Sequence, residues 1–533
     1  EFGDINTDQE MLKEGLTDFT KIGIGIFNQT KFTQHGDIKF SDINTLKEES
    51  DKTLYLHSYA IKSFFPGEAP APVAGADWGC NCDYTQKGNI DINIINYGFG
   101  ISNGRGALDV QNETGSCFTQ QGKIKIHEIN NKGVGITNYW LFTQEGEIII
   151  GNIVGDDSTI PDPPPRGLGG RGVGYTSMWQ NRSTGIWNNY IYNNTKKQAN
   201  ITIGFNENYG IDYGLGILNS GLSFKQTGKL SINHIKNKGL GIQSVQQFYY
   251  GYGNPDKETT IPPTGVWKQD DYGYTQDGDI SITLIHNSIG IITGGSNYNQ
   301  AGNININEIN SIGLSEEERK TFGYGLYIRP PGSGYAYYDY YSVYYYYYYG
   351  TALKKIDYKQ EGNIVFNNLK GKSTGIGISD WYSFREFPGL YNYLYPLLPA
   401  ELVPFFWGTA PNSEISYEQS GTIKIGEKGN GITEQSRFLS LIQLLTEHPE
   451  EPGYNFSFTY TVQASGEIKL FKGNSTQLGA GIYIPNAAGK VVNNGKVSLV
   501  TEDDPLNSPY FYLDQTVVPN NSDGFDTGNG TYD

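Results

Sequence analysis

The residues with the most distinctive contact chemistry in this chain are tyrosines gathered between positions 335 and 349. Five lie between 335 and 341, and six more form an unbroken run from 344 to 349. Tyrosine offers a large, rigid contact area and a hydroxyl at small entropic cost, which suits recognition of a protein or glycan surface. The same side chains would also serve to cover the flank of a scaffold, and both interpretations stay open. The candidate ligand-binding residues are Tyr335, Tyr337, Tyr338, Tyr340, Tyr341, Tyr344, Tyr346, Trp381 and Trp407.

Catalytic patterns are scarce. The stretch 167–172 has the glycine spacing of a dinucleotide-binding loop, but it follows a proline-rich segment instead of a strand. The chain has no Gly-x-Ser-x-Gly nucleophile motif and no paired-histidine metal motif, and we expect His127 and His234 to be surface residues. We therefore predict no catalytic residues, no metal site and no cofactor. A carbohydrate-cleaving site would need clustered carboxylates, for which acidic residues such as Asp156 and Asp270 remain the alternative source.

A recurring unit must position all of these residues. Nine times an aromatic residue is followed by Gln two positions later, by Gly four later and by Ile or Leu six later. This alternation of period two indicates a strand, and a unit that cannot bury its apolar face alone predicts stacked copies. Another aliphatic residue recurs further on, as Ile95 and Ile129 do, which predicts a turn and a second buried face. The copies begin at Phe32, Tyr84, Phe118, Phe142, Phe224, Tyr274, Tyr298, Tyr358 and Tyr417.

The spacing of the copies predicts the fold. Phe118 and Phe142 stand 24 residues apart with no insertion, and a Gly-x-Gly-Ile signal typical of tight turns recurs between copies. A coil of this size, built of short strands, predicts an all-β, right-handed parallel β-helix (a β-solenoid). Degenerate copies near Gln198 and Gln463 bring the total to about eleven coils. The repeated Gln has the parity of the buried Ile, so we expect the stacked amides to hydrogen-bond to one another.

The strand positions that alternate with the buried residues of the repeat should face water. One such row runs Lys39, Asp91, Lys125, Ile149, Ser231, Ser281, Asn305, Val365 and Lys424, and its mixed charges give no acidic row. The domain organisation follows from the repeat. We predict an N-terminal cap, or residues added for expression, at 1–20, one β-helix domain at 21–500 and a tail or linker at 501–533. Long insertions are expected near 45–80, 155–180, 245–270, 314–356, 380–413 and 434–455, and these carry the individuality of the protein.

Composition agrees with an exported scaffold. The chain has 69 Gly and 41 Tyr but only 3 Cys, and its net charge is -17. This acidity argues against nucleic acid as a partner, because phosphate recognition needs a basic surface. The apolar stretch from Phe387 to Gly408 contains four prolines, which would break a helix, so we expect a packed loop there, with a membrane or partner contact as the alternative.

Cys80, Cys82 and Cys117 are the disulfide candidates. The first two precede the repeat that starts at Tyr84, and Cys117 directly precedes the next repeat. Neighbouring coils are spaced within the range that a disulfide tolerates, so either Cys80 or Cys82 could bridge to Cys117. The parity is imperfect, because Cys82 lies two residues before its aromatic and Cys117 one. Zinc binding and a reactive thiol are the alternatives.

The alternation of Gln-x-Gly-x-Ile-x-Ile with Gly-x-Gly-Ile units, from about Ile22 to Leu499, resembles the passenger domains of autotransporters (type V secretion), especially adhesins and vacuolating-cytotoxin-like proteins. That family also carries a C-terminal outer-membrane barrel, and residues 506–533 show none of its amphipathic strands. The resemblance implies a cell-surface or released protein of a Gram-negative bacterium, attached to the outer membrane through the absent barrel.

The first functional expectation is a non-enzymatic virulence adhesin. Its aromatic-rich loops on a β-helix rod would bind host cells or other bacteria, through a host-cell surface protein or glycan, and self-association stays open. The alternatives are a secreted toxin subunit of the vacuolating-cytotoxin type, a polysaccharide-degrading β-helix enzyme, or a stalk that carries a separate tip.

Overall fold

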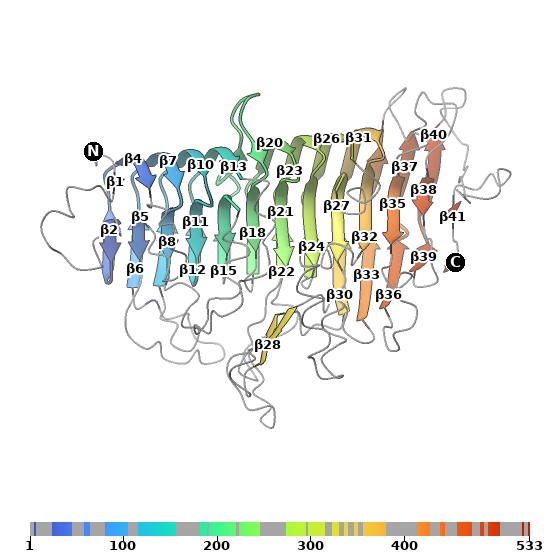
Figure 1. Cartoon of the computed structure of the whole chain (residues 1–533). Coiled ribbons are helices and arrows are strands. Elements are labelled where there is room, and N and C mark those ends of the chain that lie inside the picture. The colour runs from blue at the N-terminus through green and yellow to red at the C-terminus, as the bar shows by residue number, and fades with distance from the viewer. Residues whose placement is uncertain are drawn as a thin grey trace, which may run out of the picture. The chain divides into compact units, whose positions relative to one another are not determined.

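The structure is a computed structural model of the whole chain, and all of its described elements are β-strands (Figure 1). It divides into two compact units, Glu1–Asn233 with Pro262–Lys268, and His234–Ile261 with Gln269–Asp533. The structure describes residues 5–6, 24–44, 58–63, 80, 82–104, 116–155, 182–188, 191–219, 223–245, 273–294, 297–314, 322–329, 335–338, 346–349, 355–379, 413–426, 437–442, 456–471, 480–483, 489–500, 525–526 and 531–532.

The first unit contains three parallel sheets. Sheet A runs in the order β1 (Ile5–Asn6), β4 (Ile38–Asn44), β7 (Ile90–Asn96), β10 (Ile124–Asn130), β13 (Ile148–Val154), β16 (Ile201–Ile203) and β20 (Leu230–Lys236), with β17 (Ile211–Asp212) beside β13. Sheet B consists of β2 (Ile24–Asn28), β5 (Tyr59–Ser63), β8 (Phe99–Asn103), β11 (Val134–Asn138), β14 (Thr184–Asn188) and β18 (Leu215–Asn219). Sheet C consists of β3 (Lys31–Gln34), β6 (Cys82–Gln86), β9 (Ser116–Gln120), β12 (Leu141–Gln144), β15 (Ile191–Asn194) and β19 (Ser223–Gln226).

The second unit repeats the plan. Sheet A contains β23 (Ile280–His286), β26 (Ile304–Ser311), β31 (Ile364–Gly371), β34 (Thr422–Ile425), β37 (Glu467–Phe471) and β40 (Lys496–Val500). Sheet B contains β21 (Leu240–Val245), β24 (Ile289–Gly294), β27 (Tyr324–Arg329), β32 (Thr374–Ser379), β35 (Arg437–Ile442), β38 (Ala480–Tyr483) and β41 (Phe525–Asp526). Sheet C contains β22 (Gly273–Gln276), β25 (Asn297–Gln300), β30 (Lys355–Gln360), β33 (Ser413–Gln419), β36 (Phe456–Val462), β39 (Gly489–Asn493) and β42 (Thr531–Tyr532).

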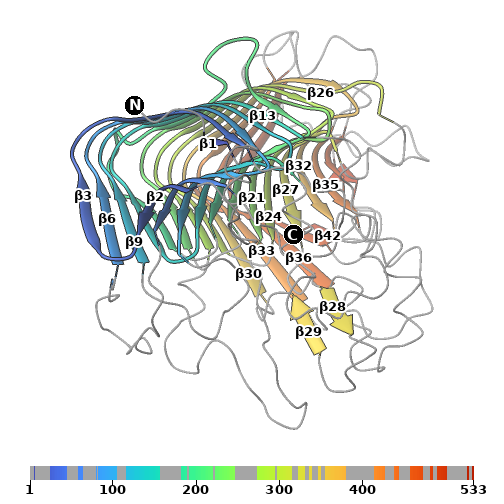
Figure 2. The same cartoon turned by 60° about the vertical axis from the view of Figure 1, so that its left-hand side comes forward.

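Each coil contributes one strand to each sheet in the order B, C, A, so the fold is the expected parallel β-helix (Figure 2). The described strands make six complete coils in each unit, one coil more than the eleven expected for the chain. The additional coil is β38–β39–β40, where Val491 and Asn493 replace the aromatic and Gln letters. The degenerate copies are also shifted from their expected places, because Asn194 and Val462, not Gln198 and Gln463, align with the Gln positions.

Aliphatic side chains from sheet A fill the interior. Ile92 pairs in register with Ile126, and Ile95 pairs with Ile129, and all four are buried. The expectation of a turn between Ile92 and Ile95 is wrong, because both lie in the single strand β7. The pairing skips Asn93 and His127, so the strand bends there and the inward parity shifts by one residue.

The aromatic letters stack in a column along sheet C. In the first unit the rings of Phe118 and Phe142 lie 5.1 Å apart and within 4° of parallel. In the second unit the column consists of Tyr274, Tyr298, Tyr358, Tyr417 and Tyr460, with ring centroids 4.5 to 5.1 Å apart. The spacing equals the strand separation of a β-sheet, so register alone places each ring on the next.

The Gln residues are buried and stacked as predicted, but their hydrogen bonding differs from the prediction. Gln360 Nε2 donates to the carbonyl of Gly362 at 3.1 Å, and its Oε1 accepts from the Tyr417 hydroxyl of the next coil at 2.7 Å. These bonds replace the predicted Gln-to-Gln bonds, which are therefore wrong for this pair of coils, although Gln144 Oε1 accepts from the Asn194 amide of the next coil at 3.2 Å. The long side chain instead reaches the turn carbonyl two residues on, which has left the strand and needs a donor. Equivalent Tyr to Gln bonds join Tyr192 to Gln144, Tyr298 to Gln276, Tyr358 to Gln300 and Tyr460 to Gln419.

The amide ladder that the chain does have is made by asparagine. At the end of sheet B in the first unit, three bonds of 2.8 Å run in chain order, from Asn103 Nδ2 to Asn138 Oδ1, from Asn138 Nδ2 to Asn188 Oδ1 and from Asn188 Nδ2 to Asn219 Oδ1. Asn138 Nδ2 also donates to the Ile191 carbonyl at the start of a sheet C strand. The ladder therefore fixes the turn from sheet B into sheet C. An Asn two residues after the repeated Ile, as in Ile136-Thr-Asn138, was the overlooked signal.

Glycine governs the turn from sheet C into sheet A. A Cβ on Gly122 would lie 2.0 Å from the Gly88 carbonyl oxygen, and a Cβ on Gly362 would lie equally close to that of Gly302. Successive turns thus touch backbone to backbone, which leaves no room for a side chain. Among the coils, this corner has two to four residues, except for the six at 195–200.

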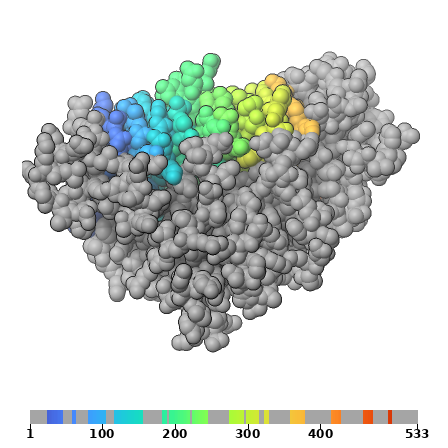
Figure 3. All heavy atoms as spheres, viewed as in Figure 1, coloured from blue at the N-terminus to red at the C-terminus, as the bar shows by residue number. Residues whose placement is uncertain are grey.

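The three sheets differ in what covers their outer faces. Every residue of β8, β11, β14 and β18 is buried, so these four strands of sheet B are covered on both faces. Sheet A strands such as β10 alternate between buried and partly exposed residues. The outward face of sheet A is therefore open, and its atoms are visible in the space-filling view (Figure 3).

The Tyr to Gln bond predicts opposite effects of adding and removing one hydroxyl. Gln120 Oε1 is buried without a partner, because the next coil carries Phe142 instead of Tyr. We expect Phe142→Tyr to raise the free energy of unfolding by about 1 kcal/mol and Tyr417→Phe to lower it by about 1 to 2 kcal/mol. Urea unfolding followed by far-UV circular dichroism measures both. A less stable Phe142→Tyr variant would contradict this account of the column.

The buried tyrosine column predicts alkaline destabilisation. Burial raises the pKa of Tyr298, Tyr358, Tyr417 and Tyr460 well above the ordinary tyrosine value. Above about pH 10 the unfolded chain loses these protons while the folded chain retains them, so the free energy of unfolding falls as pH rises. The expected loss is about 1 kcal/mol per pH unit for each such tyrosine. Unfolding midpoints between pH 8 and pH 11.5 test this, and a midpoint that stays constant above pH 10 would refute it.

Candidate binding surfaces

The long insertions all connect to the β-helix scaffold at one of the two ends of the sheet B strands. Between sheets B and C they span 64–81, 104–115, 246–272, 330–354, 380–412 and 443–455, and between sheets A and B they span 45–58, 155–183, 312–323, 426–436 and 472–479. Three ranges expected to be insertions contain scaffold strands of sheet B, namely β5, β27 and β35. Those coils lack the full Gly-x-Gly-Ile signal, and β5 reads Tyr59-Ala-Ile61 instead.

The tyrosine cluster contains a two-stranded antiparallel hairpin, inserted between β27 and β30. Its strands are β28 (Tyr335–Tyr338) and β29 (Tyr346–Tyr349). Tyr335 pairs with Tyr349 and Tyr337 with Tyr347, so the pleat places these four positions on one face of the ribbon. Positions 336, 338, 346 and 348 share the other face. Seven of the eight positions are Tyr.

The hairpin accounts for four of the nine predicted ligand-binding residues, namely Tyr335, Tyr337, Tyr338 and Tyr346. The other five lie outside the described residues: Tyr340, Tyr341, Tyr344, Trp381 and Trp407. The apolar stretch from Phe387 to Gly408 lies outside them as well. The hairpin is therefore the part of the predicted binding surface whose backbone the structure describes.

The disulfide joins Cys80 to Cys117, with their Cα atoms 5.5 Å apart. Register explains why Cys82 is not the partner. Cys82 aligns with Ser116 and shares the inward parity of Tyr84, whereas Cys117 aligns with Asp83 and has the opposite parity. The bridge ties the insertion before β6 to the strand of the following coil. Cys80 has the same parity in the sequence as Cys82, but it precedes β6 and is therefore not held by the alternation of that strand.

Cys82 is a free, fully buried thiol in a polar cluster. Its Sγ lies 3.3 Å from Ser63 Oγ and accepts from Asn28 Nδ2 at 3.1 Å, and Ser63 Oγ lies 3.3 Å from Ser116 Oγ. Ser63 occupies the coil position that holds Asn elsewhere, so the cluster replaces one rung of the asparagine ladder. Burial raises the pKa of the Cys82 thiol, which opposes reactivity at this position.

The outward row of sheet A stacks as the repeat predicts. Asp91 pairs in register with Lys39 on one side and Lys125 on the other, so this carboxylate neighbours two cations instead of a second carboxylate. In the second unit the row continues from Ser281 through Asn305 and Val365 to Lys424. The row therefore mixes cationic, anionic, neutral polar and aliphatic residues. Within the described ranges, no three His, Cys, Asp or Glu side chains group closely enough to hold a metal ion.

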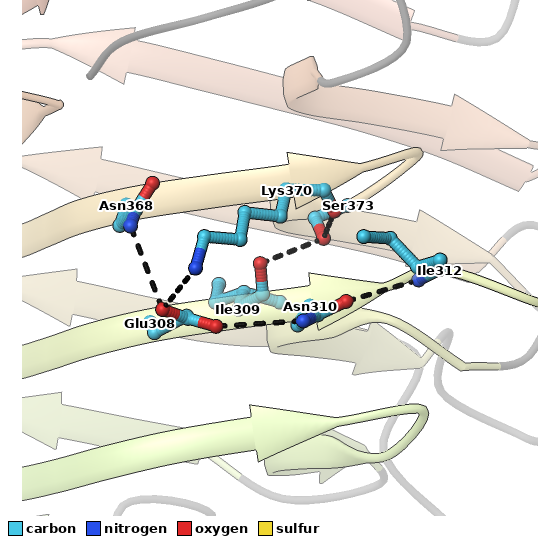
Figure 4. Close-up of polar contacts among 7 residues, drawn as sticks. All are labelled: Glu308, Ile309, Asn310, Ile312, Asn368, Lys370 and Ser373. Atoms are coloured by element: carbon cyan, nitrogen blue, oxygen red, sulfur yellow. Dashed lines mark hydrogen bonds and ion pairs between the residues drawn. The ribbon is translucent and has the colours of Figure 1, made fainter. Parts of the chain in front are cut away.

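Polar side chains of β26 and β31 in the second unit bond to one another and to nearby backbone groups. Glu308 of β26 accepts from Lys370 Nζ of β31 at 2.7 Å, and Asn310 accepts from the Ile312 amide at 3.1 Å (Figure 4). Ser373 Oγ donates to the Ile309 carbonyl at 3.0 Å and so secures the turn after β31. Since such exposed pairs contribute little energy each, we interpret this face as scaffold surface.

The two histidines differ in environment. His127 is partly exposed, and its Nε2 lies 3.0 Å from Asp91 Oδ1. His234 is only 8% exposed, so the expectation that it is a surface residue is wrong. The bend of the sheet A strands moves this part of each strand out of the simple alternation from which the expectation came.

No described segment forms a helix that could cross a membrane.

A short loop on the open face of sheet A was missed in the sequence. Residues 204–210 separate β16 from β17 within what is one continuous strand in the neighbouring coils. The loop rises above the sheet between β13 and β20 (Figure 1) and protrudes in the space-filling view (Figure 3). A signal for it was the wide separation of Ile203 and Ile211, where other coils place the equivalent aliphatic residues three positions apart.

Comparison with known proteins gives no match, whether to protein-family models, to curated proteins or to solved structures.

The disulfide predicts a thiol count and a stability difference. The bridge closes a segment of 37 residues, for which chain entropy gives a stabilisation of about 4 kcal/mol. We expect the Cys80→Ser, Cys117→Ser double variant to lose about 2 to 4 kcal/mol in urea unfolding. A thiol reagent should find no reactive group in the native chain, one in urea without reductant and three after reduction. Three reactive thiols in urea alone would exclude the bridge.

Proposed function

We propose that this chain is a binding protein of the adhesin type, surface-exposed or secreted by a Gram-negative bacterium, which contacts host cells or other bacteria through its insertions. The observation that carries the proposal is the placement of those insertions. Every insertion of eight or more residues starts or ends at sheet B, while the corner between sheets C and A never exceeds six residues. A scaffold that concentrates variation at two of its three corners suits recognition.

The tyrosine hairpin is the element to which we assign contact with the target. It lies in the insertion 330–354 and presents Tyr at seven of eight strand positions. Rigid aromatic residues of this kind supply much of the binding energy at protein surfaces and also suit glycans. The autotransporter resemblance of the repeat is consistent with this role, and the net charge of -17 disfavours nucleic acid as the target.

The register of the hairpin defines the test. One variant replaces Tyr335, Tyr337, Tyr347 and Tyr349 with Ser, and a second replaces Tyr338, Tyr346 and Tyr348. We expect one of the two to reduce attachment of the fluorescent chain to epithelial cells or to bacteria by about ten-fold or more, because hot-spot residues share one face. A third variant carries a Gly-Ser linker in place of 330–354 and should match the weaker of the two.

The control replaces 472–479 with Gly-Ser residues of equal number, since this insertion of the same unit leaves from the other end of sheet B. It should bind as the unmodified chain does. All variants are first compared by circular dichroism. Unchanged attachment of a folded 330–354 variant would overturn the assignment to the hairpin, and an unmodified chain that attaches to neither cell type would overturn the adhesin proposal.

A further inference from the structure

The loop 204–210 on the first unit is held in one conformation from both sides. Asn233 Nδ2 of β20 donates to the Asn206 and Tyr209 carbonyls at 2.6 and 2.9 Å, and Asn152 Oδ1 of β13 accepts from the Gly210 amide at 3.0 Å. Gly204 begins the loop at φ +77°, where a Cβ would meet the Tyr209 carbonyl. These bonds fix the loop before any ligand arrives, which lowers the cost of binding.

The loop displays an aromatic pair on a face whose outward row carries Asp91, Lys125 and Ile149. Phe205 is 41% exposed, and its ring stacks on that of Tyr209 at 4.4 Å. Beneath it is Gly151, whose missing side chain makes room, since a Cβ there would lie 2.9 Å from Phe205 Cε1. The other exposed phenylalanines among the described residues, Phe27 and Phe32, belong to the first coil. Exposure of Phe205 is therefore a local property of this loop.

Polar groups of β7 and β10 lie beside the aromatic pair. The Lys125 ammonium is 5.7 Å from the centre of the Phe205 ring, and the His127 ring meets it edge-on at 6.4 Å. His127 in turn pairs with Asp91 at 3.0 Å, with side chains 33% and 42% exposed. The result is an apolar surface one or two rings wide, bordered by a cation, an imidazole and a carboxylate whose positions are fixed by sheet register.

We propose that Phe205 and Tyr209, with Lys125, His127 and Asp91, form a binding site for a neutral oligosaccharide lying on the open face of sheet A. One face of a sugar ring is lined by C–H groups that pack on an aromatic ring, while its hydroxyls need donors and acceptors around the edge. The site offers both. Its charged groups are of mixed sign, and the chain is strongly acidic, which favours an uncharged ligand over a sulfated or carboxylated one.

The geometry disfavours a peptide ligand. β10 is paired with β7 on one side and β13 on the other, so this face offers no free edge for an added strand. Of the flanking outward positions, Asp91 and Lys125 are charged and Ile149 is apolar, so the row gives no continuous apolar groove for an amphipathic helix. The surface of sheet A around the loop is also flat, because successive coils place equivalent positions side by side. An extended chain of sugar rings fits such a surface.

This site goes beyond the proposed function, because it lies on the scaffold face and uses no insertion at the ends of sheet B. The two proposals can therefore fail separately. The variant with a linker in place of 330–354 should retain full oligosaccharide binding, and loss of Phe205 should leave the hairpin unchanged.

The test is calorimetric titration of the full chain with cellohexaose, xylohexaose, mannohexaose and laminarihexaose, and with a heparin hexasaccharide as the anionic probe. We expect at least one neutral probe to bind. Phe205→Ala and Phe205→Leu should weaken it by about ten-fold or more, while Phe205→Tyr stays within about two-fold. Leu fills the space above Gly151 without an aromatic ring, so it separates packing from recognition. The matched control is Phe27→Ala, which removes another exposed ring of the same unit.

Thermal unfolding confirms that each variant is folded before titration. The proposal is overturned if the unmodified chain binds none of the neutral probes at millimolar concentration, if only the heparin hexasaccharide binds, or if folded Phe205→Leu binds a neutral probe as tightly as the unmodified chain.

Discussion

In-register stacking of the turn between sheets C and A is the constraint on which the rest of this protein depends. The turn glycines approach so closely that a Cβ on one would lie about 2 Å from the carbonyl oxygen of the previous coil. The Gln two residues earlier bonds to the turn glycine's own carbonyl, and in five coils the hydroxyl of the next coil's Tyr bonds to the residue at the Gln position. Backbone contact and side-chain bonding thus select one register, and a slip by one residue would place every buried side chain on the wrong face.

Once that corner is fixed, the other two corners are free to vary. Insertions of up to 33 residues, as at 380–412, leave from the ends of sheet B without disturbing the columns in sheets A and C. A loop closed by an already ordered scaffold costs little more as it lengthens. The asparagine ladder restores order at the B to C corner in the first unit, where Asn103 and Asn138 bond to each other and to the next strand. The corner between sheets C and A is therefore nearly constant in length, while the two corners at sheet B vary.

The open face of sheet A and the ends of sheet B offer two kinds of recognition. Insertions such as 330–354 bring many aromatic positions together, whereas the loop 204–210 places one aromatic pair on a surface fixed by register. Both use tyrosine or phenylalanine, which bury large areas with few rotatable bonds. Neither depends on a pocket, so both suit ligands that are extended or part of a larger surface.

The residues of the repeat predict much of this architecture. The period of two, the 24-residue spacing and the recurring Gln and Gly predicted a parallel β-helix, its inward columns and the row from Lys39 to Lys125. These features are local or strictly periodic, so neighbouring copies constrain one another. The sequence also indicated the tyrosine cluster and narrowed the disulfide to two pairings.

Tertiary structure decided what depends on direction and reach. Whether Gln bonds to another Gln or to a tyrosine depends on the length of the side chain relative to the spacing of the coils. Cys82 is not the partner of Cys117 because its thiol lies on the inward face of β6, whereas Cys80 precedes that strand. The buried state of His234 and the display of Phe205 follow from a bend and from a loop inside a strand, which alternation alone does not reveal. The sequence by itself determined the repeating scaffold, because similar repeats in neighbouring coils must adopt the same conformation to stack in register. The tertiary structure decided the exceptions, because each of them depends on contacts that occur in one coil and are not repeated in the others.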